Sequence, residues 1–403
     1  MNRAATFFRD LTLKPQGVTV VIAAFLPIIA IVAMFPVVPS LIAHFAADPS
    51  AKVKVPLMVA APGLAIALLS PFAGLAVDRF GRRRLLLVAT FFYGLFGAAP
   101  LFLDNLDAIF ATRLGLGVCE AGILTTVNTL IGDYWDDRAR KNWLFLQGVV
   151  GPFLAAFVTL AGGFSVKLLW NGVFLVYLVA FPIWLAMLAW IFEPQRPERP
   201  AAPVAQAPAS APFPLAEAVI VAAMTLVASA LYYVFIISGG LAFAEIGVTQ
   251  PERVGELTFV PSLCVMLGAT IFRLLAGRPN AVQLATFLAL IGSGLAGIGL
   301  SRTVPEMLAA LCVQQTAAGM AVPVLIAWAQ TKFDYAHRGR GMGLWTGAFF
   351  FGQFSSPWLV HRLDLATGSI KGAFTVAGSC GLAAMVVLLA LALRHCAARP
   401  AIA

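Results

Sequence analysis

The chain contains twelve apolar runs of about twenty residues, and short polar segments separate them. A run of that length spans the hydrocarbon core of a bilayer as a helix, because lipid offers no partner to an open backbone. Hydrophobic residues make up 61% of the chain and charged residues only 11%, which is too little charge for a soluble surface. The sequence therefore predicts an all-α integral membrane protein. The expected spans are roughly 18–40, 56–77, 84–103, 107–131, 142–164, 168–192, 215–238, 255–276, 280–300, 304–330, 341–360 and 371–393.

These spans form two sets of six on either side of a segment rich in proline and alanine. Residues 193–214 show no apolar periodicity, which is typical of an extended linker. A shift of 200 residues pairs Arg138 with Arg338 and Arg140 with Arg340, as expected for an internal repeat. We therefore expect a six-helix half over 1–192, a linker over 193–214 and a second six-helix half over 215–403.

Lysine and arginine gather in alternate connecting segments, including residues 1–17, 79–84, 138–141 and 338–340. This asymmetry predicts that both termini and the linker are cytoplasmic. It also explains the sequence pI near 9.6 without a nucleic-acid partner. The first apolar run is too long for a signal peptide, so we expect it to be a retained span. The chain has no N-x-[ST] sequon and has short loops, which favours a bacterial inner membrane.

The loop between the second and third spans reads GLAVDRFGRRR. It resembles the G-x-x-x-D-R-x-G-R-[RK] signature of the major facilitator superfamily. The matching residues are Gly74, Asp78, Arg79, Gly81, Arg82 and Arg83. The twelve spans, the central linker and the HRGRGMG loop before the eleventh span extend the resemblance to the whole chain. The resemblance implies a secondary transporter, similar to drug or metabolite:proton antiporters, whose two halves rock around a site at mid-membrane.

A conformational latch follows from the position of Asp78 at the end of the second span. The eleventh span begins near Arg338 and Arg340, where the first helical N–H groups have no partner, and a carboxylate suits that helix end. The resemblance implies that this contact holds the two halves together. Alternatively, the arginines only anchor the loop in the cytoplasm. The equivalent stretch of the second half, LLAGRPNA, has no aspartate, so the latch would be one-sided.

Two charged residues lie inside the fourth span, where charge is costly. Arg113 and Glu120 are seven residues apart and so share one helix face. A carboxyl group without a partner at that depth would bind a proton rather than stay ionised. We therefore expect Glu120, with Arg113, to couple transport to protons. The spacing resembles the fourth helix of Spinster-like transporters, although the first span here has no acid. The alternative is a structural Arg–Glu pair.

Neutral polar side chains in other spans are candidates for the substrate cavity. They are Asn128, Gln147, Tyr232, Tyr233, Gln314, Gln315, Trp328, Gln330 and Gln353. The five cysteines and four histidines are dispersed and form no metal motif, and there is no phosphate-binding loop. We expect no catalytic residues, no cofactor and no metal.

The sequence thus predicts a monomeric carrier, not an enzyme, with a small-molecule substrate, protons and membrane lipid as partners. Proton-coupled efflux is the first hypothesis, and uptake of a metabolite by proton symport is the second. A polytopic sensor or scaffold without transport is the alternative from another class.

Overall fold

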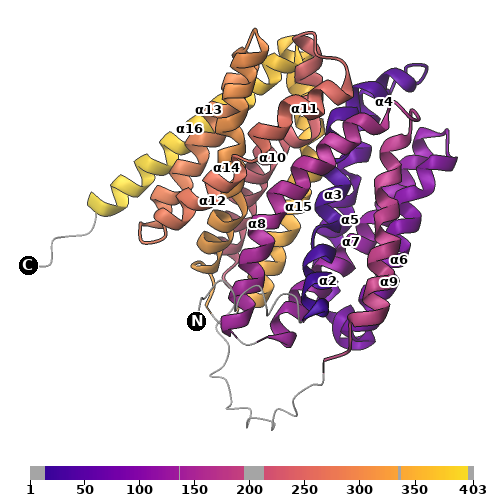
Figure 1. Ribbon diagram of the computed structural model, residues 1–403. Helices are drawn as coiled ribbons and strands as arrows, with labels where there is room; N and C mark the ends of the chain where they lie inside the picture. The colour runs from indigo at the N-terminus through magenta and orange to yellow at the C-terminus, as the bar shows by residue number, and fades with distance from the viewer. Residues whose placement is uncertain (1–13, 136, 195–212, 335–336, 398–403) are drawn as a thin grey trace, which may run out of the picture.

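The computed structural model describes residues 14–135, 137–194, 213–334 and 337–397, and this part of the chain is helical without strands (Figure 1). The elements of the first half are α2 (Pro15–Ala23), α3 (Leu26–Val32), the 3₁₀ helix η1 (Phe35–Val37), α4 (Val38–His44), α5 (Ala51–Phe80), α6 (Arg82–Ala98), η2 (Ala99–Phe102), α7 (Leu106–Tyr134), α8 (Asp137–Ser165), η3 (Gly172–Val179) and α9 (Ala180–Trp190). Those of the second half are α10 (Leu215–Glu245), α11 (Pro251–Ser262), α12 (Val265–Leu274), α13 (Asn280–Leu300), α14 (Val304–Gln330), α15 (Arg338–Thr367) and α16 (Ile370–Ala397).

Ten helical segments of this part of the chain are long and apolar enough to cross a membrane. A shorter apolar helix, Val150–Ser165, lies within α8, and α15 is as long as a span but more polar. With these two, the helices account for the twelve expected spans, so the all-α membrane fold is confirmed. Most of the predicted linker, residues 195–212, lies outside the described residues.

The first span is broken into four pieces, whereas the sequence pattern predicted one continuous helix over 18–40. Pro27, Pro36 and Pro39 lie within this span. Each proline lacks the N–H that would bond the carbonyl four residues earlier, and its ring crowds that carbonyl. The breaks therefore occur next to the prolines. Irregular backbone at membrane depth is tolerated where protein covers it, and η1 packs against α8, α10 and α11.

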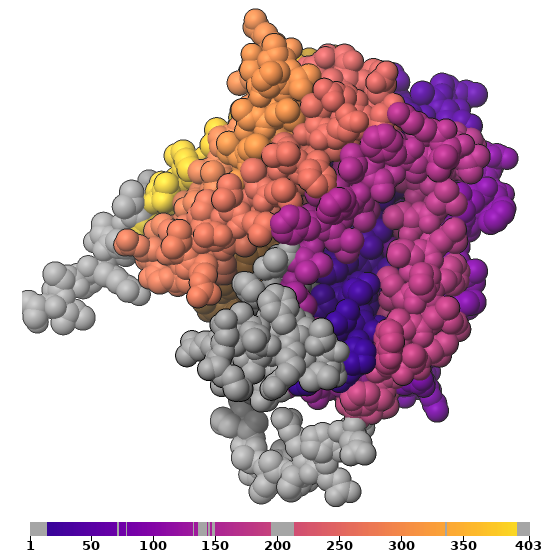
Figure 2. Space-filling model, viewed as in Figure 1, coloured from indigo at the N-terminus to yellow at the C-terminus, as the bar shows by residue number. Residues whose placement is uncertain are grey.

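The two halves lie side by side along the bundle (Figure 1). We call the end where α9 stops and α10 starts the linker end, and the opposite end, where α4 stops and α11 starts, the far end. Between the halves, α5 packs along α15 and α8 packs along α11. Figure 2 shows the first half, in indigo to magenta, against the second half, in salmon to yellow.

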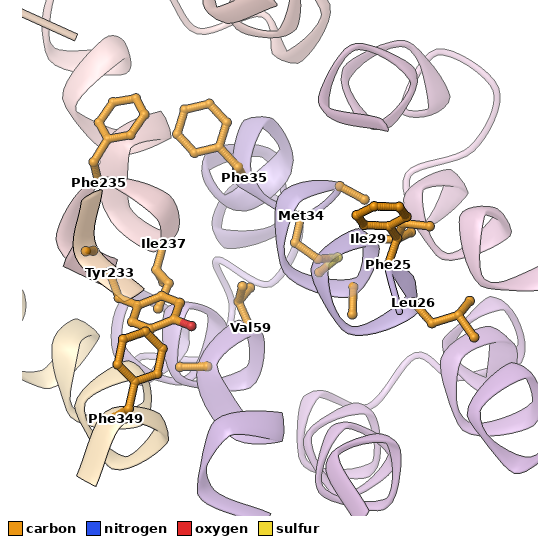
Figure 3. Packing of buried hydrophobic residues seen from close by; sticks show 14 of the residues in the cluster. Phe25, Leu26, Ile29, Met34, Phe35, Val59, Tyr233, Phe235, Ile237 and Phe349 are labelled. Carbon is orange, nitrogen blue, oxygen red and sulfur yellow. The ribbon is translucent and has the colours of Figure 1, made fainter. Parts of the chain in front are cut away.

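The buried core runs through the broken first span into the second half (Figure 3). Phe25, Leu26 and Met34 of the first span are almost fully buried. Phe35 meets Phe235 of α10 with ring centroids 5.0 Å apart. Because lipid tails are as apolar as these side chains, close packing rather than removal from water holds such helices together. The first span thus packs against helices of both halves.

Candidate functional site

Arg113 and Glu120 lie on one buried face of α7. Arg113 is 1% exposed and Glu120 is 2% exposed. Both charged side chains are therefore buried within the fourth span. Their side chains have different environments.

The Arg113 guanidinium binds the end of α6. Its Nη2 donates to the carbonyls of Phe96 and Gly97, each at 2.9 Å. The Phe96 carbonyl is available because residue 100, four positions later, is a proline without an N–H. A cation also suits the negative end of a helix dipole. Arg113 therefore caps α6 where it changes into η2.

Two aromatic rings of η3 also contact the same guanidinium. The Arg113 carbon Cζ lies 5.1 Å from the ring centroid of Phe174 and 4.7 Å from that of Tyr177. Such cation–π contacts are worth about 2 kcal/mol when they are desolvated. Nε and Nη1 of Arg113 have no hydrogen-bond partner among the described residues. The guanidinium is thus held by two carbonyls of α6 and two rings of η3 rather than by a carboxylate.

Glu120 is an acid without that support. Its Oε1 is buried and has no hydrogen-bond partner within the described part of the chain. The Arg113 guanidinium and the hydroxyls of Tyr93, Tyr177 and Tyr233 lie within electrostatic range of the carboxyl group. Tyr233 belongs to α10, so the environment of Glu120 extends to the second half.

Two of these tyrosines also fix the broken first span. The Tyr93 hydroxyl donates to the Leu26 carbonyl at 2.6 Å, and the Tyr177 hydroxyl donates to the Ala30 carbonyl at 2.9 Å. Both bonds are buried, where a lost partner costs about 1–3 kcal/mol. α6 and η3 therefore hold α3 in place.

A cavity of about 30 Å³ lies between the halves. Its lining comes from both of them: Val32, Phe35, Thr159, Phe235, Ile236, Thr258, Ser262 and Gln315. Its volume suits one water or a hydroxyl-sized group. A larger groove of about 250 Å³ lies between α2 and α9, is lined mainly by apolar side chains and touches the first half alone. Of these two cavities, the smaller one draws its lining from both halves.

The predicted cavity residues have different positions. Gln315 lines the inter-half cavity. Tyr232 and Tyr233 form an aromatic cluster with Phe349, and Gln353 packs on Gly63 of α5 across the interface. The inter-half cavity is not lined by the buried residues Gln314 and Trp328, nor by the exposed residues Asn128 and Gln330. The side chain of Gln147 lies outside the described residues.

The signature loop makes a tight corner at Gly81. α5 ends at Phe80 and α6 begins at Arg82, so one residue turns the chain, with φ at 83°. Glycine alone adopts this conformation without strain. Glu193 caps the new helix: its carboxylate accepts from the backbone N–H groups of Arg82 at 2.8 Å and Arg83 at 2.7 Å.

The loop arginines extend this network within the first half. Arg82 Nε lies 3.1 Å from Asp133 Oδ2 at the end of α7. Arg83 Nε donates to the Ile191 carbonyl at 2.7 Å, beyond the end of α9. The loop therefore joins the linker ends of α6, α7 and α9. Sequence reasoning missed Glu193 and Asp133. Both acids lie at ends of predicted spans, on the same side of the membrane as the basic loop, so this signal was present in the sequence.

The predicted latch contact of Asp78 stays a prediction. The Asp78 side chain lies outside the described residues, and a methyl group on Gly74 would meet none of the described atoms within 4 Å. The Arg79 guanidinium lies 5.8 Å from the ring centroid of Phe80. In the second half, Arg338 is exposed, and Arg340 contacts His337 at 3.3 Å and the ring of Phe213 at 5.4 Å.

The sequence profile of the Major Facilitator Superfamily matches residues 20–281, which include the signature loop and the fourth span. The chain belongs to the major facilitator superfamily. It is therefore a multi-pass membrane transporter for small molecules and not an enzyme.

Two curated transporters have similar sequences. The 3-(3-hydroxy-phenyl)propionate transporter of Escherichia coli (strain K12) is 26% identical over 310 residues, which cover 74% of each chain. The efflux pump dotC of Dothistroma septosporum is 27% identical over 138 residues. That match covers 34% of this chain and about a quarter (24%) of the pump.

Solved structures share the fold at low identity. A D-xylose–proton symporter has a TM-score of 0.78 at 14% identity, covering 93% of this chain and 96% of its own. The human organic anion transporter MFSD10 (TETRAN) has a TM-score of 0.67 at 17% identity, covering 92% and 98%. At these identities the likeness concerns the fold alone.

The far end of the transporter is closed by contacts between α8 and α11. A methyl group on Gly163 would lie 2.5 Å from the Pro251 carbonyl oxygen, so the two backbones touch there. Next to this contact, Lys167 Nζ and Glu252 Oε1 form an ion pair at 3.3 Å. Sequence reasoning missed this pair because nothing in the sequence places residues 85 positions apart side by side.

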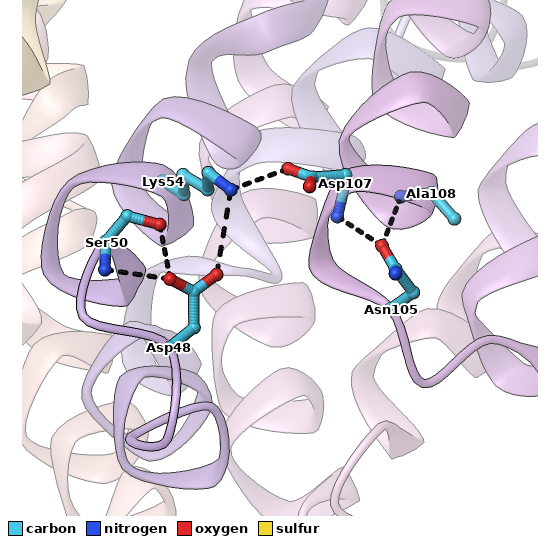
Figure 4. Close-up of polar contacts among 6 residues, drawn as sticks. All are labelled: Asp48, Ser50, Lys54, Asn105, Asp107 and Ala108. Atoms are coloured by element: carbon cyan, nitrogen blue, oxygen red, sulfur yellow. Dashed lines mark hydrogen bonds and ion pairs between the residues drawn. The ribbon is translucent and has the colours of Figure 1, made fainter.

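A second far-end network holds the first half of the transporter together (Figure 4). Lys54 Nζ lies 2.8 Å from Asp107 and 3.6 Å from Asp48, and so joins α5 to the start of α7. Asn105 caps α7, since its side chain accepts from the backbone N–H of Asp107 and Ala108. The Ser50 hydroxyl and N–H donate to Asp48 and hold the pKa of that carboxyl below its usual range.

Proposed function

We propose that this chain is a proton-coupled transporter that exports a small organic molecule, with Glu120 as the group that carries the proton. The observation that supports this role is the buried Oε1 of Glu120, which has no hydrogen-bond partner among the described residues. An ionised carboxylate without a partner is costly at that depth, so the group binds a proton in this conformation. Arg113 does not satisfy it, because α6 carbonyls and two aromatic rings already hold the guanidinium.

Release of the proton then requires a different environment for Glu120. The tyrosines that interact electrostatically with its carboxyl group belong to α6, η3 and α10, and α10 belongs to the half that moves against the first. A change in the packing of the halves would therefore change the water and charge around the carboxyl group. Arg113 would stabilise the ionised form through its two unpartnered nitrogens.

The test of this role is transport by Glu120→Gln in proteoliposomes under an imposed pH gradient. A lumenal pH dye reports proton movement when members of a panel of small organic molecules are added. We expect Glu120→Gln to bind the same molecules as the parent protein and to move no protons with them. Glu256→Gln, at an exposed acid of α11, is the matched control and keeps coupled transport. Accumulation against a gradient by Glu120→Gln would contradict the proposal.

Uptake by proton symport is the second candidate function. It is supported by the match over 74% of the chain to a transporter named for 3-(3-hydroxy-phenyl)propionate, since the efflux match covers only 34% of the chain. The direction of substrate movement relative to the proton gradient in the same vesicles separates the two. Substrate leaving the acidic side together with protons indicates symport.

We also propose that the linker end faces the cytoplasm of a bacterial inner membrane, so that both termini are inside and this conformation is closed to the outside. The distribution of lysine and arginine supports this orientation. A membrane-impermeant thiol reagent applied to intact cells should label Asp48→Cys and not Ala202→Cys. Labelling of Ala202→Cys from outside would reverse the orientation. We propose a monomer, with a lipid chain in the groove between α2 and α9.

The latch remains part of the proposal. Asp78→Asn removes a charge worth up to about 2 kcal/mol at a helix terminus, which corresponds to a shift of up to about thirtyfold between the two states. If Asp78 binds the start of α15 when the linker end is closed, spin-label distances across that end lengthen in the variant. Unchanged distances and unchanged flux would leave Asp78 with an anchoring role only.

A further inference from the structure

The hydroxyl groups of the inter-half cavity already donate their protons to their own helices. Thr159 Oγ1 donates to the Ala155 carbonyl at 2.9 Å, and Thr258 Oγ1 donates to the Val254 carbonyl at 2.8 Å. A hydroxyl has one proton and two lone pairs. These side chains therefore offer the cavity only acceptor lone pairs.

Ser262 follows the same rule one turn after Thr258. Its Oγ donates to the Thr258 carbonyl at 2.8 Å, close to the break between α11 and α12. Pro261 lies inside this turn of α11 and leaves the Leu257 carbonyl without its helical N–H donor. Three oxygen acceptors from two halves thus surround one small cavity, together with the Gln315 amide, which both donates and accepts.

The remainder of the lining is apolar and aromatic. The rings of Phe35 and Phe235 lie on the two sides of the interface with centroids 5.0 Å apart. No charged side chain lines this cavity within the described residues. Two cations described above already have partners elsewhere: carbonyls of α6 hold Arg113, and Lys167 is paired with Glu252. An anion placed here would lack a counter-charge and would find only the Gln315 amide as a side-chain donor among the lining residues, so its burial would cost several kcal/mol.

We propose that this cavity is an acceptor-rich subsite that takes the uncharged O–H or N–H group of an aromatic substrate and rejects a carboxylate. The inference rests on the proposed transport function and names the substrate class of the same pathway. A phenol fits this chemistry: its proton reaches the Thr and Ser oxygens, and its ring meets Phe35 and Phe235. In the present conformation the cavity has room for the hydroxyl alone. The ring follows when the halves separate.

The test compares three ligands at equilibrium on the full-length protein in nanodiscs, without a pH gradient. They are methyl 3-(3-hydroxyphenyl)propionate, its O-methyl ether and the free acid 3-(3-hydroxyphenyl)propionate, with binding followed by calorimetry. We expect the phenol ester to bind about threefold to tenfold more tightly than the ether, since one hydrogen bond is lost. The ionised acid should bind at least about tenfold more weakly than the ester.

Variants connect this preference to the cavity. Thr258→Val and Ser262→Ala remove acceptors and should reduce the ratio of phenol to ether affinity toward one. Thr270→Val is the matched control, because its hydroxyl also donates to its own helix, at 2.8 Å to the Met266 carbonyl, but it lies on α12 outside the cavity. It should leave the ratio unchanged.

Several results would overturn the inference: an acid that binds as tightly as the ester, an ether as tight as the phenol, a ratio unaffected in Thr258→Val and Ser262→Ala, or no binding of the phenol ester by folded protein. Failure of the coupling role is a separate result. If Glu120→Gln still couples transport while the phenol preference holds, Glu120 is not the proton carrier and the subsite remains.

Discussion

Gly163 offers a direct way to shift the transporter between its two states. It lies in the far-end contact, where an added methyl group would be 2.5 Å from the Pro251 carbonyl oxygen and 3.1 Å from the Glu252 Cα. Both atoms belong to the backbone of α11, so no side-chain rotation relieves the overlap. In Gly163→Ala, α8 and α11 must separate by about 1 Å to restore ordinary van der Waals contact.

The size of the effect follows from the cost of overpacking. An extra carbon in a tightly packed contact costs about 1–3 kcal/mol. This cost falls on the conformation in which α8 and α11 touch and is absent when the far end opens. The ratio of far-end-open to far-end-closed molecules should therefore rise by about 5-fold to 140-fold.

Pulsed electron–electron double resonance between nitroxides at Lys52 and Thr249 measures this ratio. Both residues are exposed near the far end, one in each half, and the labels are introduced after replacement of the native cysteines. Gly163→Ala should populate a longer distance than the parent. Gly343→Ala is the control, because a methyl group there meets no described residue within 4 Å and adds helix propensity in the same way. A distance distribution in Gly163→Ala that coincides with that of the parent would refute this reasoning.

Three other predictions concern charges. Lys167→Glu should favour the far-end-open distance by no more than about thirtyfold, because it removes an ion pair worth about 0.2–1 kcal/mol and adds a like-charge repulsion of similar size; Lys167→Glu with Glu252→Lys should return the distribution toward that of the parent. Glu193→Gln weakens the cap of α6 and should cost about 0.5–2 kcal/mol in thermal unfolding, while Glu256→Gln leaves the melting temperature unchanged; equal melting for the two variants counts against the cap. The lowered pKa of Asp48 means that its contribution to stability is present above its usual pKa and is lost as the pH falls through the lowered value, so melting curves of Asp48→Asn should depend less on acidification than those of the parent.

The spans were predictable from the sequence because the bilayer allows few alternatives. Helices in lipid need about twenty apolar residues, and the twelve runs meet that demand within a few residues at each end. The three prolines of the first span were equally visible, but the number of breaks was not. A proline kinks or ends a helix according to what packs around the free carbonyl, and here η1 is covered by α8, α10 and α11.

The site shows the same division. The sequence alone placed an acid and a cation on one face of the fourth span, and the signature loop identified the family. It also left open whether Arg113 and Glu120 pair. That depends on η2, where Pro100 leaves the Phe96 carbonyl free and the guanidinium binds it instead. A helix pattern cannot show this, since the carbonyl lies on a neighbouring helix.

Composition and spacing therefore determined the class of protein, the number of spans and the position of Glu120 within its span, because each of these depends on local length and hydropathy. Only the tertiary structure decided which groups have partners. The cap by Glu193, the far-end pair of Lys167 with Glu252 and the acceptor cavity between Thr159 and Thr258 join residues from about 85 to 110 positions apart. Their contacts depend on how each helix is rotated against its neighbours, and packing of the whole bundle sets that rotation.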